Sequence, residues 1–332
     1  MNTTNLIGWI ISAVVYGTVL AISAMGETIN EKAGHLNLGV PGIMYLAGFV
    51  SYYCVYQYAS GIGLTPGLGQ QILIAVIALA SSFAVGALFG LIYSVMCVTF
   101  KANQNVMGLA IASFGVGFGV FLSWVAGKNG RIQVATDVFN SGIAGLKDLG
   151  VAGKLLFNYS FMTYLTLFVI ILVTLFMNFT RPGLNLKAVG ESPSTADSAG
   201  INIVKYKYLA TLVGCGFCGV GGMAYVFTFS NASWSTNNNI ESIGWLAVAL
   251  VIFASWKPRH LIWGAPLFGL LFWAYNYLPS IFAFKAFTGF TEMMQVLPYL
   301  VTIIILIINS LRKKKDDQPP ESLGLSYFRE ER

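Results

Sequence analysis

Long apolar runs separated by short polar segments fill most of the chain. They lie at Leu6–Ala24, Val40–Ala59, Gln70–Phe100, Val106–Ala126, Tyr159–Phe179, Tyr208–Phe229, Ile243–Trp256, Leu261–Ile281 and Met293–Leu311. The runs are continuous rather than alternating, which favours helices and excludes a β-barrel. Because about 20 helical residues cross a bilayer core about 30 Å thick, the pattern predicts an all-α, polytopic transmembrane helical bundle of about nine (8–10) spans.

The composition agrees with a membrane protein and excludes a water-soluble globule. Charged residues make up 10% of the 332 residues and apolar residues 56%, against about 25% and 45–50% in ordinary soluble domains. The predicted spans contain no Asp, Glu, Lys, Arg or His, and residues such as Glu27 and Glu31 are predicted to flank spans or lie in loops. Ion-coupled carriers generally need an ionisable residue within the bilayer, so a proton-driven mechanism is poorly supported.

Basic residues are distributed unequally between the two sides of the predicted bundle. If the tail that begins at Arg312 is cytoplasmic and the spans alternate, most of the 19 Lys and Arg residues fall on the cytoplasmic side. The positive-inside rule then predicts an external N-terminus and a cytoplasmic C-terminus. The chain is divided into one transmembrane domain, residues 1–311, and a cytoplasmic tail, residues 312–332. Its longest inner loop is 180–207, and its outer loops include Gly127–Asn158 and Ser230–Ser242.

Motifs for catalysis, nucleotide binding and metal binding are absent from the sequence. There is no GxxxxGK[ST] loop, HExxH or GxSxG motif, and only two histidines are present. Cys215 and Cys218 form a CxxC pattern, but they lie in a glycine-rich apolar run, where helix packing explains them better than redox or metal chemistry. The sequence therefore predicts no catalytic residue, no metal site, no cofactor and no nucleic-acid partner.

The polar segment Gly26–Gly42, between the first two predicted spans, has two interpretations. Its charges and glycines could form a hydrophilic cytoplasmic turn. Alternatively, it could form a broken, partly re-entrant element whose backbone is sheltered by protein. The sequence leaves both interpretations open.

A second segment with helix signals, Arg181–Ile201, lies in the inner loop. Ser192 is a good N-cap, Pro193 suits the first helical position, and Gly200 suits the end of a helix. These signals predict a two-turn helix, which is too short to be stable alone. It could be a solvated connector packed on its own bundle, or a helix that docks into a groove on a cytoplasmic partner.

Four segments together resemble a known family. They are Gly26–Gly42, Leu186–Ile201, Gly244–Phe253 and Leu323–Arg332. The sequence is similar to membrane permeases of ATP-binding-cassette (ABC) importers in the simple-sugar and nucleoside branch of the branched-chain amino acid/ribose-type superfamily. Residues 102–110 are more similar to the second, shorter of the paired nucleoside permeases. His35 and Pro41 depart from the pattern of that branch.

The resemblance implies a non-catalytic subunit that forms half of a translocation pathway in a bacterial inner membrane. A cytoplasmic ATPase with two cassettes would contact the short helix, and a second, related permease would complete the pathway. A substrate-binding lipoprotein would deliver the solute to the outer loops Gly127–Asn158 and Ser230–Ser242. The expected ATPase-coupling residues are Gly190, Glu191, Ser192, Pro193, Ser194, Thr195, Ala196, Asp197, Ala199 and Gly200.

A pathway without buried charge suits a neutral polar solute. Amide, hydroxyl and aromatic side chains could bind hydroxyl groups and stack on a base or a sugar, or they could instead join helices. The candidates are Asn37, Gln104, Asn105, Ser113, Ser123, Trp124, Trp245 and Tyr275. The resemblance at 102–110 favours nucleosides. The alternatives are a ribose- or galactose-like sugar, a self-sufficient secondary carrier or channel, and a structural protein of the membrane.

Overall fold

Long helices build the body of the computed structural model, which describes residues 3–63, 65–142, 150–282, 289–312 and 317–328. The long helices are α1 (Thr3–Lys32), α2 (Val40–Ala59), α3 (Leu68–Ser94), α4 (Gln104–Ala126), α7 (Phe161–Phe179), α10 (Ile203–Ala224), α11 (Ile240–Phe253), α12 (Leu261–Phe282) and α14 (Leu297–Arg312). Short π-helical turns extend α3 through Val95–Thr99 and α10 through Tyr225–Phe229.

Shorter elements connect the long helices. They are α5 (Gln133–Asn140), α6 (Gly150–Phe157), α8 (Arg181–Glu191), α9 (Pro193–Ser198), α13 (Phe290–Gln295), a 3-10 turn (Pro258–His260) and the strands β1 (Gly130–Arg131) and β2 (Ser233–Trp234). The two strands pair antiparallel, with Gly130 opposite Trp234, and so they join the two predicted outer loops.

The predicted all-α polytopic bundle is confirmed. Within the described residues, seven helices are long and apolar enough to cross a membrane. Helix α2 and the shorter apolar helix α11 are not among these seven, so the number of nine spans stays a prediction. Of the seven, the helix formed by α10 and its π-helical end is the most buried, and it packs against α1, α2 and α3.

The first helix is longer than its apolar run. It continues past Ala24 to Lys32, and it buries the carboxyl side chains of Glu27 and Glu31 at 0% and 1% exposure. The prediction that both residues flank a span or lie in a loop was therefore wrong. The physical reason is that buried polar groups are tolerated when they find hydrogen-bond partners, and distant parts of the chain supply partners here.

The connection between α1 and α2 is also buried. His35 and Asn37 are 1% and 0% exposed, so this segment is not a hydrophilic turn. The interpretation of a backbone sheltered by protein is correct for residues 33–39, but α1 is not broken before Lys32.

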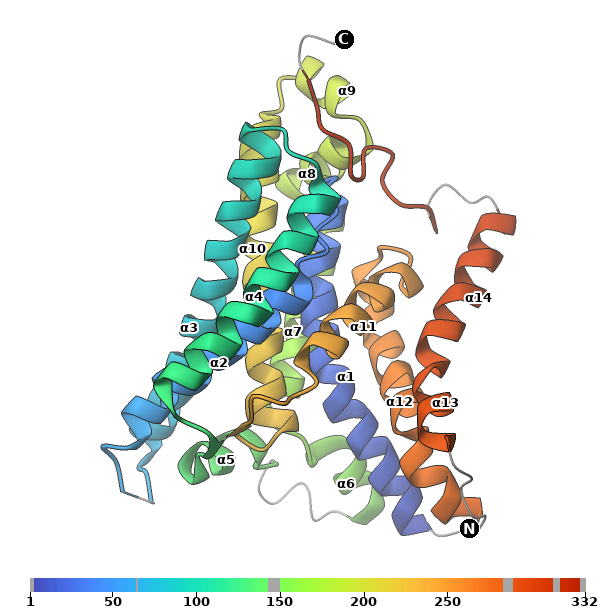
Figure 1. Cartoon of the computed structure of the whole chain (residues 1–332). Helices are drawn as coiled ribbons and strands as arrows, with labels where there is room; N and C mark the ends of the chain where they lie inside the picture. The colour runs from blue at the N-terminus through green and yellow to red at the C-terminus, as the bar shows by residue number, and fades with distance from the viewer. Residues whose placement is uncertain (1–2, 64, 143–149, 283–288, 313–316, 329–332) are drawn as a thin grey trace.

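The two ends of the bundle carry different elements (Figure 1). Helices α8 and α9 lie at one end together with the C-terminal segment, which we define as residues 317–328. The N-terminus, α5 and α6 lie at the opposite end. The predicted inner loop 180–207 thus contains two helices, and one of them is the predicted short helix.

Candidate functional site

Helix α9 begins and ends as its sequence signals predict. The hydroxyl of Ser192 accepts a hydrogen bond of 3.4 Å from the backbone N–H of Thr195, and Pro193 occupies the first helical position. Gly200, just after the helix, has a φ of +78°, a left-handed conformation that glycine adopts without strain. The helix itself has six residues, Pro193–Ser198.

A small apolar cluster supports this short helix. Ala196 of α9 is buried against Val189 of α8 and Ile203 of α10, and Tyr327 of the C-terminal segment packs against the same cluster. A helix of this length has little stability of its own. Tertiary packing therefore holds α9 on the bundle, and its polar face stays exposed at Ser194 and Thr195.

Helix α8 passes directly over the end of α1. A Cβ atom on Gly190 would lie 2.2 Å from the carbonyl oxygen of Lys32. Only a residue without a side chain fits between two backbones at that distance. The end of α8, from which α9 continues, is thereby fixed to the end of the first transmembrane helix.

The C-terminal segment runs across the same end of the molecule and binds two other parts of the chain. The backbone N–H of Ser322 donates to the carbonyl of Gly190 at 3.1 Å, and its hydroxyl donates to the same oxygen at 2.5 Å. The N–H of Gly324 donates to the carbonyl of Gly34 at 3.3 Å. The segment therefore joins α8 to the connection that follows α1, a role that the sequence analysis did not predict.

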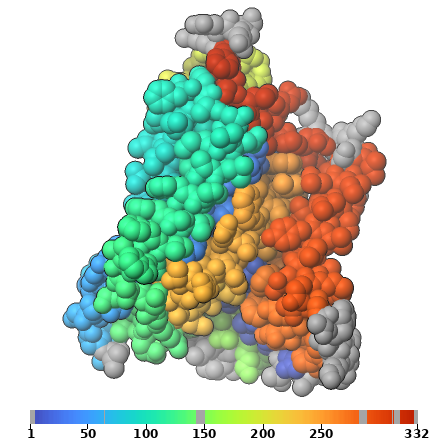
Figure 2. All heavy atoms as spheres, viewed as in Figure 1, coloured from blue at the N-terminus to red at the C-terminus, as the bar shows by residue number. Residues whose placement is uncertain are grey.

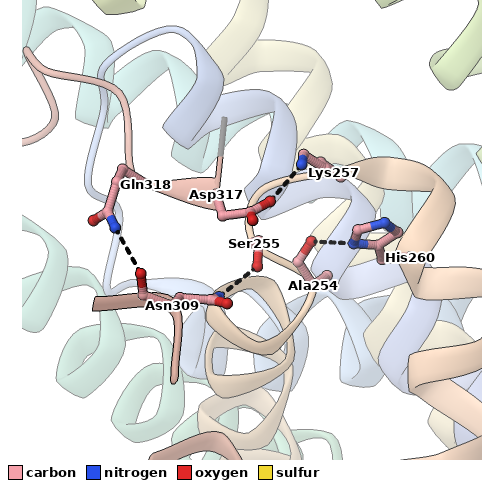
Figure 3. Close-up of polar contacts among 7 residues, drawn as sticks. All are labelled: Ala254, Ser255, Lys257, His260, Asn309, Asp317 and Gln318. Atoms are coloured by element: carbon pink, nitrogen blue, oxygen red, sulfur yellow. Dashed lines mark hydrogen bonds and ion pairs between the residues drawn. The ribbon is translucent and has the colours of Figure 1, made fainter. Parts of the chain in front are cut away.

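A second set of contacts fixes the start of the C-terminal segment to the turn after α11 (Figure 3). Lys257 forms an ion pair of 2.5 Å with Asp317, and Gln318 donates to the carbonyl of Asn309 at 3.3 Å. Asn309 in turn donates to the hydroxyl of Ser255 at 2.8 Å. The same turn places Trp256 so that its indole N–H donates to the buried carboxyl group of Glu31.

A buried polar cluster lies where α1, α10 and the connection 33–39 meet. Glu27 accepts hydrogen bonds from the side chain of Asn30 at 2.8 Å and from the backbone N–H of Asn37 at 3.1 Å. The amide of Asn37 also donates to the sulfur of Cys215 at 3.2 Å. The cluster ties the N-terminal helix to α10 and explains how a carboxyl group is accommodated there.

His35, in the same connection, contacts both α10 and α3. Its Nδ1 lies 2.7 Å from the hydroxyl of Thr211, and its ring meets that of Tyr93 edge to face. Burial, together with the nearby charges of Lys207 and Lys101, holds the pKa of His35 well below its usual value of 6.5. The imidazole is therefore neutral at physiological pH and serves as a hydrogen-bonding group.

Three of the predicted solute-binding candidates are buried and hydrogen-bonded within the bundle. Asn37 forms the hydrogen bonds with Glu27 and Cys215 that are described above. Gln104 accepts from the backbone N–H of Leu36 at 2.9 Å and donates to the carbonyl of Leu325 at 3.3 Å. Ser123 accepts from the indole N–H of Trp234 at 2.8 Å. Through these contacts the three residues hold helices to one another or to connecting segments.

The other candidates lie on or near the surface. Asn105, Ser113 and Trp124 are exposed on α4, and Trp124 is 79% exposed. Trp245 on α11 is half-buried, and Tyr275 on α12 is half-buried with its ring stacked on Trp273. Helices α4 and α11 lie on the same face of the molecule (Figure 2).

A small hollow marks the end of the bundle opposite to α9. It has a volume of about 240 Å³ and is lined by Tyr225, Trp234 and the three asparagines 237–239. Tyr45 fixes its rim, because its hydroxyl donates to the carbonyl of Thr236 at 2.9 Å. The predicted outer loop Ser230–Ser242 thus presents amide groups around a mostly buried indole.

Comparison with known proteins gives one family and several relatives. The family model described as "Branched-chain amino acid transport system / permease component" matches residues 9–306. The chain is 33% identical over 272 residues to the putative glucose ABC transporter permease protein TsgC13 of Haloferax volcanii, which covers 80% of this chain and 75% of that protein. It is 29% identical over 311 residues to the guanosine ABC transporter permease protein NupQ of Bacillus subtilis, covering 92% and 93%. It is 31% identical over 316 residues to the nucleoside ABC transporter permease protein NupC of Lactococcus lactis, covering 93% and 94%.

Proposed function

The chain belongs to the family of branched-chain amino acid transport system permease components and is a non-catalytic, multi-pass membrane permease subunit of an ABC importer. From that premise we propose that it forms half of the translocation pathway for nucleosides. We further propose that a separate cytoplasmic ATPase drives it through α9.

The alignments with nucleoside permeases support the solute class. The relatives named for guanosine and for nucleosides match more than nine-tenths of this chain and of their own length. The candidates Asn105 and Ser113, which are exposed on α4, and the half-buried Trp245 on α11 are uncharged, which suits a neutral solute with hydroxyl groups and an aromatic base. A simple sugar is the second candidate, because the relative named for glucose is 33% identical.

The position of α9 supports its role in coupling. It is a short helix with an exposed face, and it is held by α8, α10 and the C-terminal segment. A push on α9 would therefore act on α1 through Gly190 and on α10 through Ile203. Rigid-body displacement of packed elements is a known way in which a local event changes the state of a whole bundle.

The arrangement of the two ends supports a cytoplasmic C-terminus and an external N-terminus. The end with α9 also carries Lys187, Lys205 and Lys257, as the positive-inside rule requires for a cytoplasmic face. At the opposite end, the paired strands β1 and β2 join the loops that would receive a substrate-binding lipoprotein. A second, related permease would face α4 and α11. Two Lactococcus lactis proteins named as nucleoside permeases, NupC and NupB, match the chain at 31% and 24% identity, which supports a paired arrangement.

The proposal is tested by reconstituting the chain in liposomes with three candidate partners, namely a second permease, a cytoplasmic ATPase and a substrate-binding lipoprotein from the same organism. Labelled uridine, adenosine and guanosine are offered beside labelled ribose and glucose, with and without ATP. We expect ATP-dependent uptake of nucleosides and competition among them. ATP-dependent uptake of the sugars alone would replace nucleosides by the second candidate.

Two further outcomes would overturn the mechanism itself. Uptake by this chain alone, without ATP or another subunit, would identify a secondary carrier or channel. Absence of any uptake by an assembled, ATP-hydrolysing complex would favour a structural role in the membrane.

A further inference from the structure

A cavity of about 900 Å³ lies beside α9, at the end of the bundle that carries the C-terminal segment. Its walls come from the π-helical end of α3, from the connection to α4 and the first residue of α4, from α9 and the first turns of α10, and from residues 326–328. The charged side chains that line it are Lys101, Lys205, Lys207 and Asp197. Gln104 at the start of α4 also lines the cavity, whereas Asn105, Ser113 and Trp245 of the proposed translocation face do not.

Lys207 gives the cavity its unusual character. Its side chain is only 4% exposed and lines the cavity. Within the part of the chain that the structure describes, no carboxylate forms an ion pair with its ammonium group and no oxygen accepts a hydrogen bond from it. Buried cations in proteins are usually paired, because an isolated buried charge is costly. An anion in the cavity would supply the missing partner.

The start of α10 is a second, independent feature of the same wall. Asn202, Ile203 and Val204 line the cavity, and α10 is 22 residues long. The side chain of Asn202 accepts only the N–H of Lys205, at 3.0 Å. The other N–H groups of the first turn, together with the helix dipole, favour an anion at this position.

The charged side chains in the wall indicate the sign of the charge that the cavity accommodates. Among the described residues that line the cavity, three are lysines and one, Asp197, is a carboxylate. The carboxylate of Asp197 accepts a hydrogen bond from the hydroxyl of Tyr327 at 3.0 Å. The described part of the lining is therefore predominantly basic, which suits an anionic group. We propose that this cavity is a binding site for a phosphate-bearing anion, held by Lys207 at its base, by Lys101 and Lys205 at its rim, and by the start of α10.

Two sources could supply the phosphate group. A free phosphate or phosphate monoester could enter from the aqueous phase. The headgroup of an anionic lipid could enter from the membrane, since Phe100 and Val204 beside the cavity are 69% and 52% exposed. The chemistry at Lys207 is the same in both cases, and the experiment separates the sources.

The test uses the full-length chain purified in a neutral detergent. Inorganic phosphate is titrated by calorimetry against a background of matched ionic strength, and co-purified phosphatidylglycerol is measured by native mass spectrometry. Lys207→Met removes the buried positive charge that would pair with the bound anion. We therefore expect the affinity of this variant for phosphate, or the amount of phosphatidylglycerol that it retains, to fall by more than about thirtyfold. Lys205→Met removes an exposed charge and should weaken binding by about two- to fivefold.

Matched variants separate the site from general charge effects. Lys187→Met removes a partly buried lysine from α8 at the same end of the molecule, outside the cavity, and should leave binding unchanged. Lys207→Arg keeps the charge and should retain most of the binding. Because Lys205 is exposed, Lys205→Met should fold normally. It therefore tests the site even if Lys207→Met does not fold. The proposal is overturned if neither phosphate nor phosphatidylglycerol binds the wild-type chain, or if both cavity variants bind like the wild type.

Discussion

The hydroxyl of Tyr327 donates a hydrogen bond of 3.0 Å to the carboxylate of Asp197, which joins the C-terminal segment to α9. The same tyrosine accepts a hydrogen bond of 2.8 Å at its carbonyl from the ammonium group of Lys101, which follows α3. Tyr327 thereby links the proposed coupling helix to the transmembrane bundle. The C-terminal segment, residues 317–328, is thus positioned to transmit movement if α9 is the coupling helix.

Replacing Tyr327 by phenylalanine tests this link. The change removes one partly buried hydrogen bond and keeps the ring in the apolar cluster, so it should cost about 0.5–1.5 kcal/mol. If that bond transmits movement from α9, ATP-dependent uptake should fall about two- to tenfold, while membrane insertion is unchanged. Uptake is measured in proteoliposomes. A wild-type rate of uptake would show that this contact of the C-terminal segment is only structural.

Breaking α9 should abolish uptake. Thr195→Pro removes the N–H that Ser192 caps and disfavours the helical conformation of Ser194. Thr195→Ala keeps the N–H and serves as the control. Because α9 lies outside the membrane-spanning helices, both variants should insert normally. Replacement of Glu191 or Asp197 is expected to lower uptake in the same assay. Full uptake by Thr195→Pro would disprove the coupling assignment.

The contact between α3 and α10 depends on Gly86. A Cβ atom there would lie 2.2 Å from the carbonyl oxygen of Cys215, so Gly86→Ala should force the helices apart and cost about 1–3 kcal/mol. A Cβ atom on Gly117 of α4 would meet nothing within 4 Å. Gly117→Ala should therefore be neutral or stabilise by about 0.5–1 kcal/mol. Thermal unfolding in detergent distinguishes the two, and equal midpoints would contradict the packing described.

The carboxyl group of Glu27 should stabilise the end of α1. Glu27→Ala leaves the amide of Asn30 and the N–H of Asn37 without this acceptor, which should cost about 1–3 kcal/mol. Glu241→Ala, an exposed change at the start of α11, should cost less than about 1 kcal/mol. Both are compared by thermal unfolding. A similar small effect of the two changes would show that the buried cluster contributes little.

His35 should make the protein less stable in acid. Burial and the charges of Lys207 and Lys101 lower its pKa in the folded state, so below about pH 6.5 the unfolded chain binds a proton that the folded chain does not. The free energy of unfolding should then fall by up to about 1.4 kcal/mol per pH unit from this group.

The control experiment for His35 compares unfolding midpoints at pH 7.5, 6.5 and 5.5 in phosphate-free buffer. His35→Gln should show a weaker pH dependence than the wild type. Thr211→Val removes the hydrogen-bond partner but keeps the imidazole, so it should retain the pH dependence at a lower overall stability. Parallel curves for the wild type and His35→Gln would contradict the prediction.

The sequence by itself determined the membrane bundle and the outline of α9. Apolar runs and helix caps are local signals, so Val40–Ala59 appears as α2 with unchanged bounds, and Ser192, Pro193 and Gly200 delimit the short helix as expected. The tertiary structure decided the rest, because hydrogen-bond partners are distant along the chain. Trp256 lies 225 residues from Glu31, and Ser322 lies 132 residues from Gly190. Such pairs form only when the helices pack, so the sequence did not reveal that α1 continues through Glu27 and Glu31 or that residues 317–328 bind α8. Packing also decided that Lys207 is buried beside a cavity.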